Sequence, residues 1–129
     1  MSTNSSINVV NEAGEVKSVY CNFDGYIEGV GKTLIEFYND KALANELVSH
    51  GAISYIGKTI GRKHNFNSYD KKYCKFYHRD RGDDFHSNTY KNLDEALNNK
   101  IFEYNYYFIN DTWFVAYDDG KLIPVKELL

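Results

Sequence analysis

The segment at residues 102–117, FEYNYYFINDTWFVAY, decides the fold of this chain. Aromatic side chains at positions 102, 104, 106 and 108 alternate with other residues, which is the period-two pattern of a strand with one buried face. Turn residues follow at 110 and 111, and an apolar run begins at 113. We therefore expect a β-hairpin here. The aromatics expected mainly in the core or on a sheet face are Tyr104, Tyr106, Trp113 and Tyr117.

A second hairpin is expected near the beginning of the chain. Two β-prone runs, one with Ile7 and Val9 and one at residues 16–20, flank the turn cluster NEAGE at 11–15. The polar residues 1–6 are expected to be flexible. The alternation over residues 73–79 predicts one more strand, and residues 122–129 are expected to add a short strand and one helical turn.

Three segments show the signals of short helices. Apolar residues recur at helical spacing over residues 32–38 and again over 40–51, where Asp40 can cap the helix and Gly51 can end it. The letters NLDE at 92–95 fit a capping box, in which Asn92 caps the first turn and Glu95 reaches back.

These elements predict an α+β fold in a single domain over residues 1–129. We expect an antiparallel sheet, built from the two hairpins and the strand at 73–79, to pack against two or three short helices. A chain of 129 residues that are 43% hydrophobic has enough apolar material for one modest core.

The charge balance excludes a strongly basic nucleic-acid coat protein. Fifteen basic and 18 acidic residues give a formal net charge of −3, so nucleic acid could be contacted only locally. The local candidate is residues 58–72, where five basic residues face one acidic residue and give +4, and which we expect to be a long exposed loop.

Apolar runs and cysteine spacing indicate the compartment. No apolar run approaches the roughly 18 residues that cross a bilayer, and the polar start lacks a signal core, so we expect a cytoplasmic protein without membrane contact. Cys21 and Cys74 lie 53 positions apart with no Cys-x-x-Cys motif. They are expected to be reduced, buried thiols.

Two familiar motifs are matched only in part. Gly31-Lys32-Thr33 resembles the end of a phosphate-binding loop, but the first glycine of that motif would fall on Tyr26. The letters HRD at 78–80 occur in kinase catalytic loops, but no Asp-Phe-Gly follows. The four histidines lack the spacing of a metal site, although Cys74, His78 and His86 could converge if the loop between them folds back. We expect no metal and no cofactor.

The first candidate site is the segment YCNFDGYIEGVG at residues 20–31. It has three glycines within seven positions, which suits a loop with unusual backbone angles and a close approach by a ligand. On this backbone stand the candidate contact residues Phe23, Asp24, Tyr26 and Glu28. The alternative is a structural corner in which the aromatic side chains point inward.

The second candidate site is the charged motif YHRDRGDD at residues 77–84. Its candidate contact residues are His78, Arg79, Asp80, Arg81 and Asp83. They could form a solvated loop held by Arg–Asp pairs, which are individually weak at a surface. They could instead offer a bidentate arginine contact to a carboxylate or a phosphate.

At these two motifs the sequence resembles a family of small proteins encoded by phages and prophages, mostly without assigned function. A helix that ends near residues 38–39 and a helical segment closed by glycine at 51–54 add to the resemblance, which covers roughly residues 16–84. It implies a phage accessory protein that acts in counter-defence. Such a protein inhibits a host immune effector, as anti-CRISPR proteins do, or sequesters an immune signalling nucleotide.

We therefore expect a non-enzymatic binding protein whose partner is a host bacterial protein or a small signalling nucleotide. The alternative is a small hydrolase or nucleotide-modifying enzyme that uses His78 and Asp80 with Asp24 or Glu28 as acid and base. A nucleic-acid binder acting through residues 58–72 is a third hypothesis. The sequence leaves the oligomeric state open.

Overall fold

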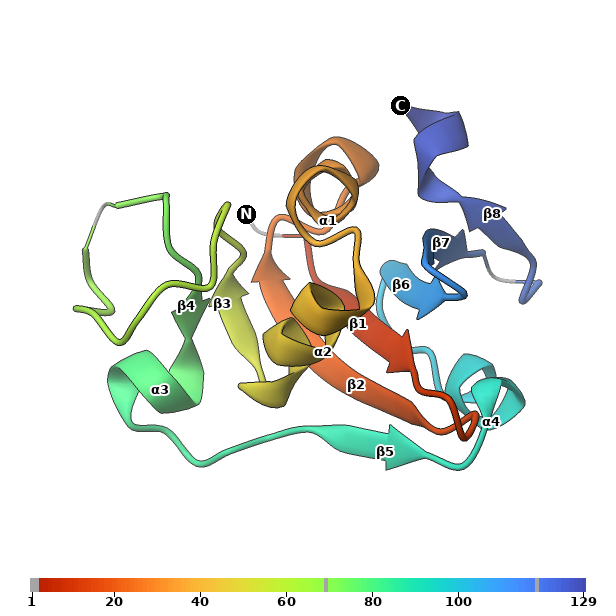
Figure 1. Ribbon diagram of the computed structural model, residues 1–129, viewed down its shortest axis with the longest axis horizontal. Helices are drawn as coiled ribbons and strands as arrows, with labels where there is room; N and C mark the ends of the chain where they lie inside the picture. Colours follow the sequence, from red (N-terminus) through yellow and green to blue (C-terminus); the bar gives the residue numbers. More distant parts are fainter. Residues whose placement is uncertain (1–2, 69, 118) are drawn as a thin grey trace.

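The computed structural model describes residues 3–68, 70–117 and 119–129, which form one mixed sheet with short helices (Figure 1). The fold is α+β, as predicted. The strands are β1 Ser5–Val10, β2 Val16–Phe23, β3 Ile53–Tyr55, β4 Lys75–Phe76, β5 Asn88–Tyr90, β6 Tyr104–Ile109, β7 Thr112–Ala116 and β8 Leu122–Pro124. The helices are α1 Lys32–Phe37, α2 Lys41–Ser49, α3 Tyr77–Arg81 and α4 Leu93–Asn98, with a π-helical turn at Ile27–Gly31 and a 3₁₀ turn at Val125–Leu128.

Both predicted hairpins are confirmed, but they are joined by a parallel pairing. Strands run in the order β4-β3-β2-β1-β6-β7-β8. Strand β5 pairs with the first residues of β2, and β3 pairs with its last residues. The pairs β1–β2 and β6–β7 are antiparallel, whereas β1–β6 and β2–β3 are parallel. The sheet is therefore mixed, although mostly antiparallel. The parallel β2–β3 pair arises because α1 and α2 carry the chain back, so that β3 runs beside the last residues of β2, with Ile53 opposite Cys21 and Tyr55 opposite Phe23.

Local signals at the turns and caps correspond to the structure. Asn110 and Asp111 have φ angles of 48° and 63°, which suit the two-residue turn that follows the twist of a hairpin. The Asp40 carboxylate accepts a hydrogen bond from the Leu43 N–H, and the Asn92 side chain accepts one from the Glu95 N–H. Both predicted N-caps are thus confirmed.

The strand predicted over residues 73–79 is wrong for most of its length. Only Lys75–Phe76 is strand, and a helix, α3, begins at Tyr77. A carboxylate oxygen of Asp80 accepts a hydrogen bond of 2.9 Å from the Phe76 N–H and stabilises the turn. Gly82, at φ 84°, ends the helix in the left-handed region. These tertiary and capping contacts override the local alternation.

Further differences lie at the first residues and in the loop after β3. Residues 1–6 were expected to be flexible, but Ser5 and Ser6 are buried in β1, and residues 1–2 lie outside the described part. The described part of residues 58–72, which leaves out residue 69, forms a largely exposed loop, as predicted, apart from the buried Ile60 and the isolated bridge between Thr59 and Tyr73.

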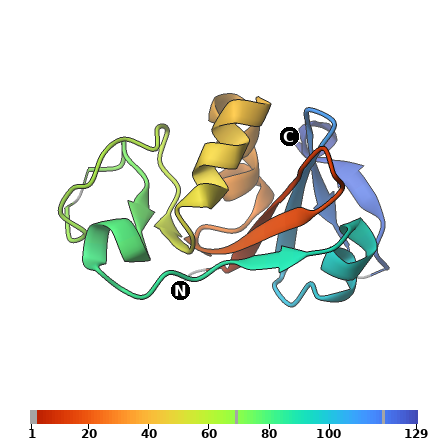
Figure 2. The same cartoon turned by 60° about the horizontal axis from the view of Figure 1, so that its bottom comes forward.

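Two apolar clusters lie on opposite faces of the sheet. Figure 2 shows α2 on one side of β1 and β2 and α4 on the other. The larger cluster, beneath α1 and α2, contains Tyr106, Trp113 and both cysteines, which are buried and form no disulfide. The smaller cluster, beneath α4, includes Tyr107 and Ala96. Tyr104 is partly buried and Tyr117 is exposed. Among the described residues, no helix is long and apolar enough to span a membrane.

Candidate functional site

The glycines of the first candidate segment allow close packing of the backbone. None of Gly25, Gly29 and Gly31 has a positive φ, contrary to the expectation of unusual backbone angles. A Cβ atom on Gly25 would lie 2.8 Å from the Thr3 carbonyl oxygen, and one on Gly29 would lie 2.4 Å from that of Asp24. This segment is therefore a tight corner, with strand up to Phe23 and a π-helical turn after it.

The four predicted contact residues of this corner differ in exposure. Phe23 and Tyr26 each expose 41% of their surface, and Glu28 is also exposed. Asp24 is partly buried, and among the described residues its buried Oδ1 atom has no hydrogen-bond partner. The side chains of Phe23 and Tyr26 are thus accessible to a ligand. The alternative of a purely structural corner predicted that they would point inward.

Arg79 and Asp80 are used by the fold itself. Arg79 donates hydrogen bonds to the Asp80 carboxylate and to the backbone carbonyls of Gly61 and Cys74. The Asp80 side chain has no exposed surface and also accepts hydrogen bonds from the backbone N–H groups of Phe76 and His64. Burial alone would raise the pKa of Asp80, but these hydrogen bonds and the charge of Arg79 lower it. The pair fastens the loop after β3 to α3.

The other residues of the charged motif lie at the surface. Arg81 donates two hydrogen bonds, of 2.9 and 2.7 Å, to the Asp83 carboxylate, and this pair raises the pKa of Arg81 and lowers that of Asp83. The Arg81 guanidinium also lies 4.7 Å from the ring centre of Phe66 and 4.8 Å from that of Tyr77. A ring nitrogen of His78 lies 2.8 Å from the Asp83 carbonyl oxygen.

The two candidate segments are neighbours in space. The Asn22 amide donates a hydrogen bond of 3.3 Å to the Tyr77 hydroxyl. The rings of Tyr20 and Tyr77 stack with their centres 6.5 Å apart. Strand β2 and helix α3 thus bring one aromatic residue of each segment together, although no pairing of Asp24 or Glu28 with His78 or Asp80 is found among the described residues.

A groove of about 560 Å³ lies between β3 and the loop after it. Its lining residues come from β2, β3, β4 and that loop; they are Phe23, Ser54, Tyr55, Phe66, Asn67, Ser68, Asp70, Lys71 and Lys75. We refer to this space as the groove. Phe23 is the one predicted contact residue in its wall, and Arg81 lies against Phe66. The predicted basic loop forms the opposite wall.

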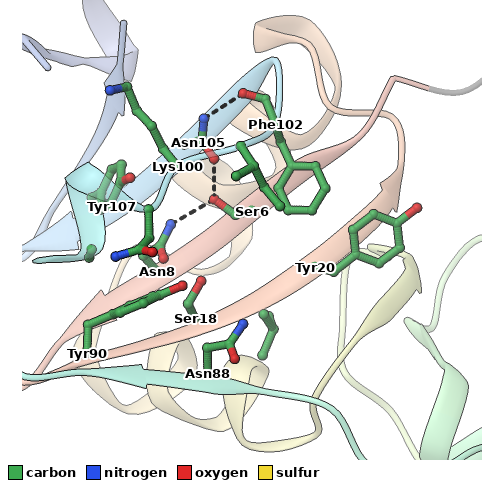
Figure 3. Close-up of a pocket in the computed structure, with 14 residues that line it drawn as sticks. Ser6, Asn8, Ser18, Tyr20, Asn88, Tyr90, Lys100, Phe102, Asn105 and Tyr107 are labelled. Atoms are coloured by element: carbon green, nitrogen blue, oxygen red, sulfur yellow. Dashed lines mark hydrogen bonds between the residues drawn. The ribbon is translucent and has the colours of Figure 1, made fainter. Parts of the chain in front are cut away.

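A second hollow lies on the face of the sheet that carries α4 (Figure 3). We call it the polar pocket; it has a volume of about 110 Å³. Its floor consists of the buried polar residues Ser6, Asn8, Ser18 and Asn105. Sequence reasoning missed it because Ser6 and Asn8 alternate with apolar neighbours, which is the pattern of a solvent-exposed strand face.

Comparison with protein-family models, curated proteins and solved structures gives no significant match to this chain. The chemistry must therefore be argued from the side chains. Within the described residues, no group of three His, Cys, Asp or Glu side chains is placed to hold a metal ion. The groove instead offers aromatic rings from Phe23, Tyr55 and Phe66 and ammonium groups from Lys71 and Lys75, of which the Lys75 ammonium also donates a hydrogen bond to the Ser68 carbonyl. Such a wall can bind a planar, negatively charged ligand.

Proposed function

We propose that this chain is a non-enzymatic binding protein that sequesters a small phosphorylated nucleotide in the groove. The observation that carries the proposal is the combination of three aromatic side chains and two lysines around one open space of about 560 Å³. Small-molecule sites commonly measure roughly 300–1,000 Å³ and combine apolar walls with a few polar groups. The size and lining of the groove suit a nucleotide.

The aromatic side chains of the groove suit the base of such a ligand, and the lysines suit its phosphate. A base has a flat π-face that stacks on aromatic rings, and in single-stranded complexes this is worth about 1–3 kcal/mol per base. Phe23 is the most exposed of the aromatic side chains in the groove wall, because Tyr55 and Phe66 are partly buried. A lysine ammonium binds phosphate as a point charge, and Lys71 and Lys75 lie on the loop side and at β4.

The contacts of the charged motif favour binding over catalysis. An acid–base residue must come within hydrogen-bond reach of its substrate. The Asp80 carboxylate is buried and accepts three hydrogen bonds from the chain. It therefore cannot reach a substrate as the acid–base partner of His78, which the alternative enzyme hypothesis requires. The groove wall contains Asp70 as its single acidic residue among those described.

The biological setting in this proposal comes from the sequence resemblance. The glycine-rich segment and the charged motif are the residues that carry that resemblance, and they meet at Tyr20 and Tyr77. The protein is then a phage-type accessory protein of the bacterial cytoplasm. It would act in counter-defence by removing a signalling nucleotide from host immunity.

Calorimetric titration of the purified chain with AMP, ATP and cyclic di-AMP tests the proposal. We expect stoichiometric binding of at least one of them, and recovery of the ligand unchanged after incubation with substoichiometric protein. Phe23→Ala should weaken binding about tenfold, because a stacking surface is lost. Tyr26→Ala is the matched control, since Tyr26 is equally exposed at 41% but lies outside the groove. Absence of binding at millimolar ligand, or equal effects of the two variants, would overturn the proposal.

A further inference from the structure

A row of four aromatic rings connects the groove with the polar pocket. Phe66 and Tyr77 have ring centres 5.6 Å apart, Tyr77 and Tyr20 6.5 Å, and Tyr20 and Phe102 5.3 Å. All four side chains are partly exposed. Phe66 lines the groove, whereas Tyr20 and Phe102 line the polar pocket. We call these four residues the aromatic row.

The floor of the polar pocket has hydrogen-bonding groups to spare. The Asn8 amide donates to the Ser6 hydroxyl, which in turn donates to Asn105 Oδ1 (Figure 3). The Asn8 amide also donates to the Tyr106 carbonyl. In the part of the chain that the structure describes, the Asn8 Oδ1 atom and the Ser18 hydroxyl have no partner. Both residues line the pocket, and neither atom is among the enclosed ones. A ligand could therefore bond to both.

The size and chemistry of the polar pocket suit a single nucleobase. One water needs roughly 10–15 Å³ of such volume, so a space of about 110 Å³ has room for several water-sized groups, as one base requires. Proteins recognise single-stranded bases by stacking on aromatic rings and by hydrogen bonds from amides and hydroxyls to the base edge. Tyr20 and Phe102 supply rings here, and Asn8 and Ser18 supply polar groups.

We infer that the ligand is a short single-stranded oligonucleotide that occupies both hollows. One base enters the polar pocket, further bases contact the aromatic row, and the other end lies in the groove. Positive charge is present at both ends, from Lys100 beside the pocket and from Lys71 and Lys75 in the groove. Arg81, stacked on Phe66 and Tyr77, lies along the path between them. This inference rests on the proposed function, because it assigns a ligand class to the same groove.

Affinity as a function of oligonucleotide length tests the inference. Fluorescence anisotropy with labelled oligouridylates of one to six nucleotides should show Kd falling with length and then reaching a plateau once both hollows are filled. A contribution of about 1–3 kcal/mol per stacked base corresponds to a gain of roughly 5- to 150-fold. Equal affinity for the mononucleotide and the hexanucleotide would overturn this inference and leave the proposed function standing.

Variants at the two ends separate the contributions. Phe102→Ala removes the ring at the pocket end, and we expect it to weaken hexanucleotide binding roughly tenfold, a larger loss than for the mononucleotide. Phe23→Ala should weaken both. Tyr117→Ala is the matched control, because Tyr117 is an exposed aromatic, at 43%, that lines neither hollow. Equal hexanucleotide affinity for Phe102→Ala and Tyr117→Ala would contradict the bridging path.

A change at the pocket floor tests recognition of the base itself. Ser18→Ala removes one hydroxyl and adds no bulk, so the sheet should fold unchanged, as circular dichroism can check. We expect it to reduce the preference among oligouridylate, oligocytidylate and oligoadenylate by roughly fivefold or more. An unchanged preference would show that the polar pocket does not read the base. If no nucleotide of any length binds, both this inference and the proposed function fail.

Discussion

The Nε atom of Arg79 donates a hydrogen bond of 3.0 Å to the Asp80 carboxylate, so two neighbours in the charged motif satisfy each other. Both side chains are largely or wholly removed from solvent, with 13% and 0% exposure. The same carboxylate accepts hydrogen bonds from the backbone N–H groups of His64 and Phe76. One buried acid thus holds together β4, α3 and the loop that forms a wall of the groove.

Asp80→Asn should destabilise the fold at neutral pH. Removing the charge leaves the buried Arg79 guanidinium without its anion, which typically costs about 3 kcal/mol. The pKa of Asp80 is lower in the folded state than its ordinary value, so its ionised form stabilises the fold. That contribution is complete above about pH 5 and is lost as the pH falls below about 4 through the folded-state pKa. Urea unfolding at pH 7 and pH 3 should show the difference between wild type and variant shrinking in acid.

Asp83→Asn serves as the control for that measurement. Asp83 also pairs with an arginine, but its partner Arg81 is at the surface, where water and salt weaken the attraction. We expect its unfolding curve at pH 7 to overlay that of the wild type. A loss of stability as large as that of Asp80→Asn would mean that surface pairing, and not burial, governs this motif.

Gly29→Ala should destabilise the corner after β2. The added Cβ would lie 2.4 Å from the Asp24 carbonyl oxygen, which is backbone and cannot move aside easily. An overpacking cost of about 1–3 kcal/mol corresponds to a fall in Tm of roughly 5–10 °C for a chain of this size. In Gly31→Ala the nearest atoms are side-chain atoms of Tyr106 and Val125 at 3.2 Å, and a smaller fall is expected. Thermal unfolding of both variants measures this order, and the reverse order would contradict the packing argument.

The sequence predicted those parts of the fold that depend on local signals. Alternation around Tyr106, the turn at Asn110 and Asp111, and caps at Asp40 and Asn92 each act within a few residues, and all four were confirmed. The α+β class follows from such elements in order. Phe23, chosen because it lies on the glycine-rich segment, lines the groove, and its role in binding stays a prediction.

The remaining features depend on contacts between distant residues. The parallel pairing of Ile7 with Tyr106 joins positions at opposite ends of the chain, and no local pattern specifies it. Helix α3 replaces part of a predicted strand because Asp80 bonds back to Phe76 and out to His64. The polar pocket depends on burial of Asn8, whose sequence pattern is that of an exposed residue. Tertiary context decided each of these cases.

Both cysteines should resist thiol reagents in the folded protein. Burial raises the pKa of Cys21 and of Cys74, so little reactive thiolate forms at pH 8. Cys74 is further enclosed by the Tyr38 hydroxyl and by the Gly57 N–H, each 3.2 Å from its sulfur. Labelling with Ellman's reagent should be slow in buffer and complete within minutes in 6–8 M urea, a concentration range that is roughly what unfolds small domains.

Tyr38→Phe tests the enclosure of Cys74. The Tyr38 hydroxyl donates a hydrogen bond of 2.6 Å to the Gly57 carbonyl, and its removal leaves that buried oxygen only the long bond of 3.8 Å from the Cys74 thiol. We expect a loss of about 1–3 kcal/mol and faster labelling of Cys74 than of Cys21, as peptide mapping would show. Equal acceleration at both cysteines would indicate global unfolding instead of a local opening at this loop.

The dependence of oligonucleotide affinity on salt should report the number of phosphate contacts. Each phosphate neutralised on a single strand contributes a slope of about −0.7 to the plot of log K against log salt concentration. The overall charge of −3 opposes a nucleic acid, so attraction must come from local cations, of which Lys71, Lys75 and Lys100 line the two hollows. Lys71→Ala should therefore reduce the magnitude of the slope by about 0.7, whereas Lys17→Ala, at an exposed site outside both hollows, should leave it unchanged. A slope near zero for the wild type would mean that stacking alone holds the ligand and that these lysines make no phosphate contact.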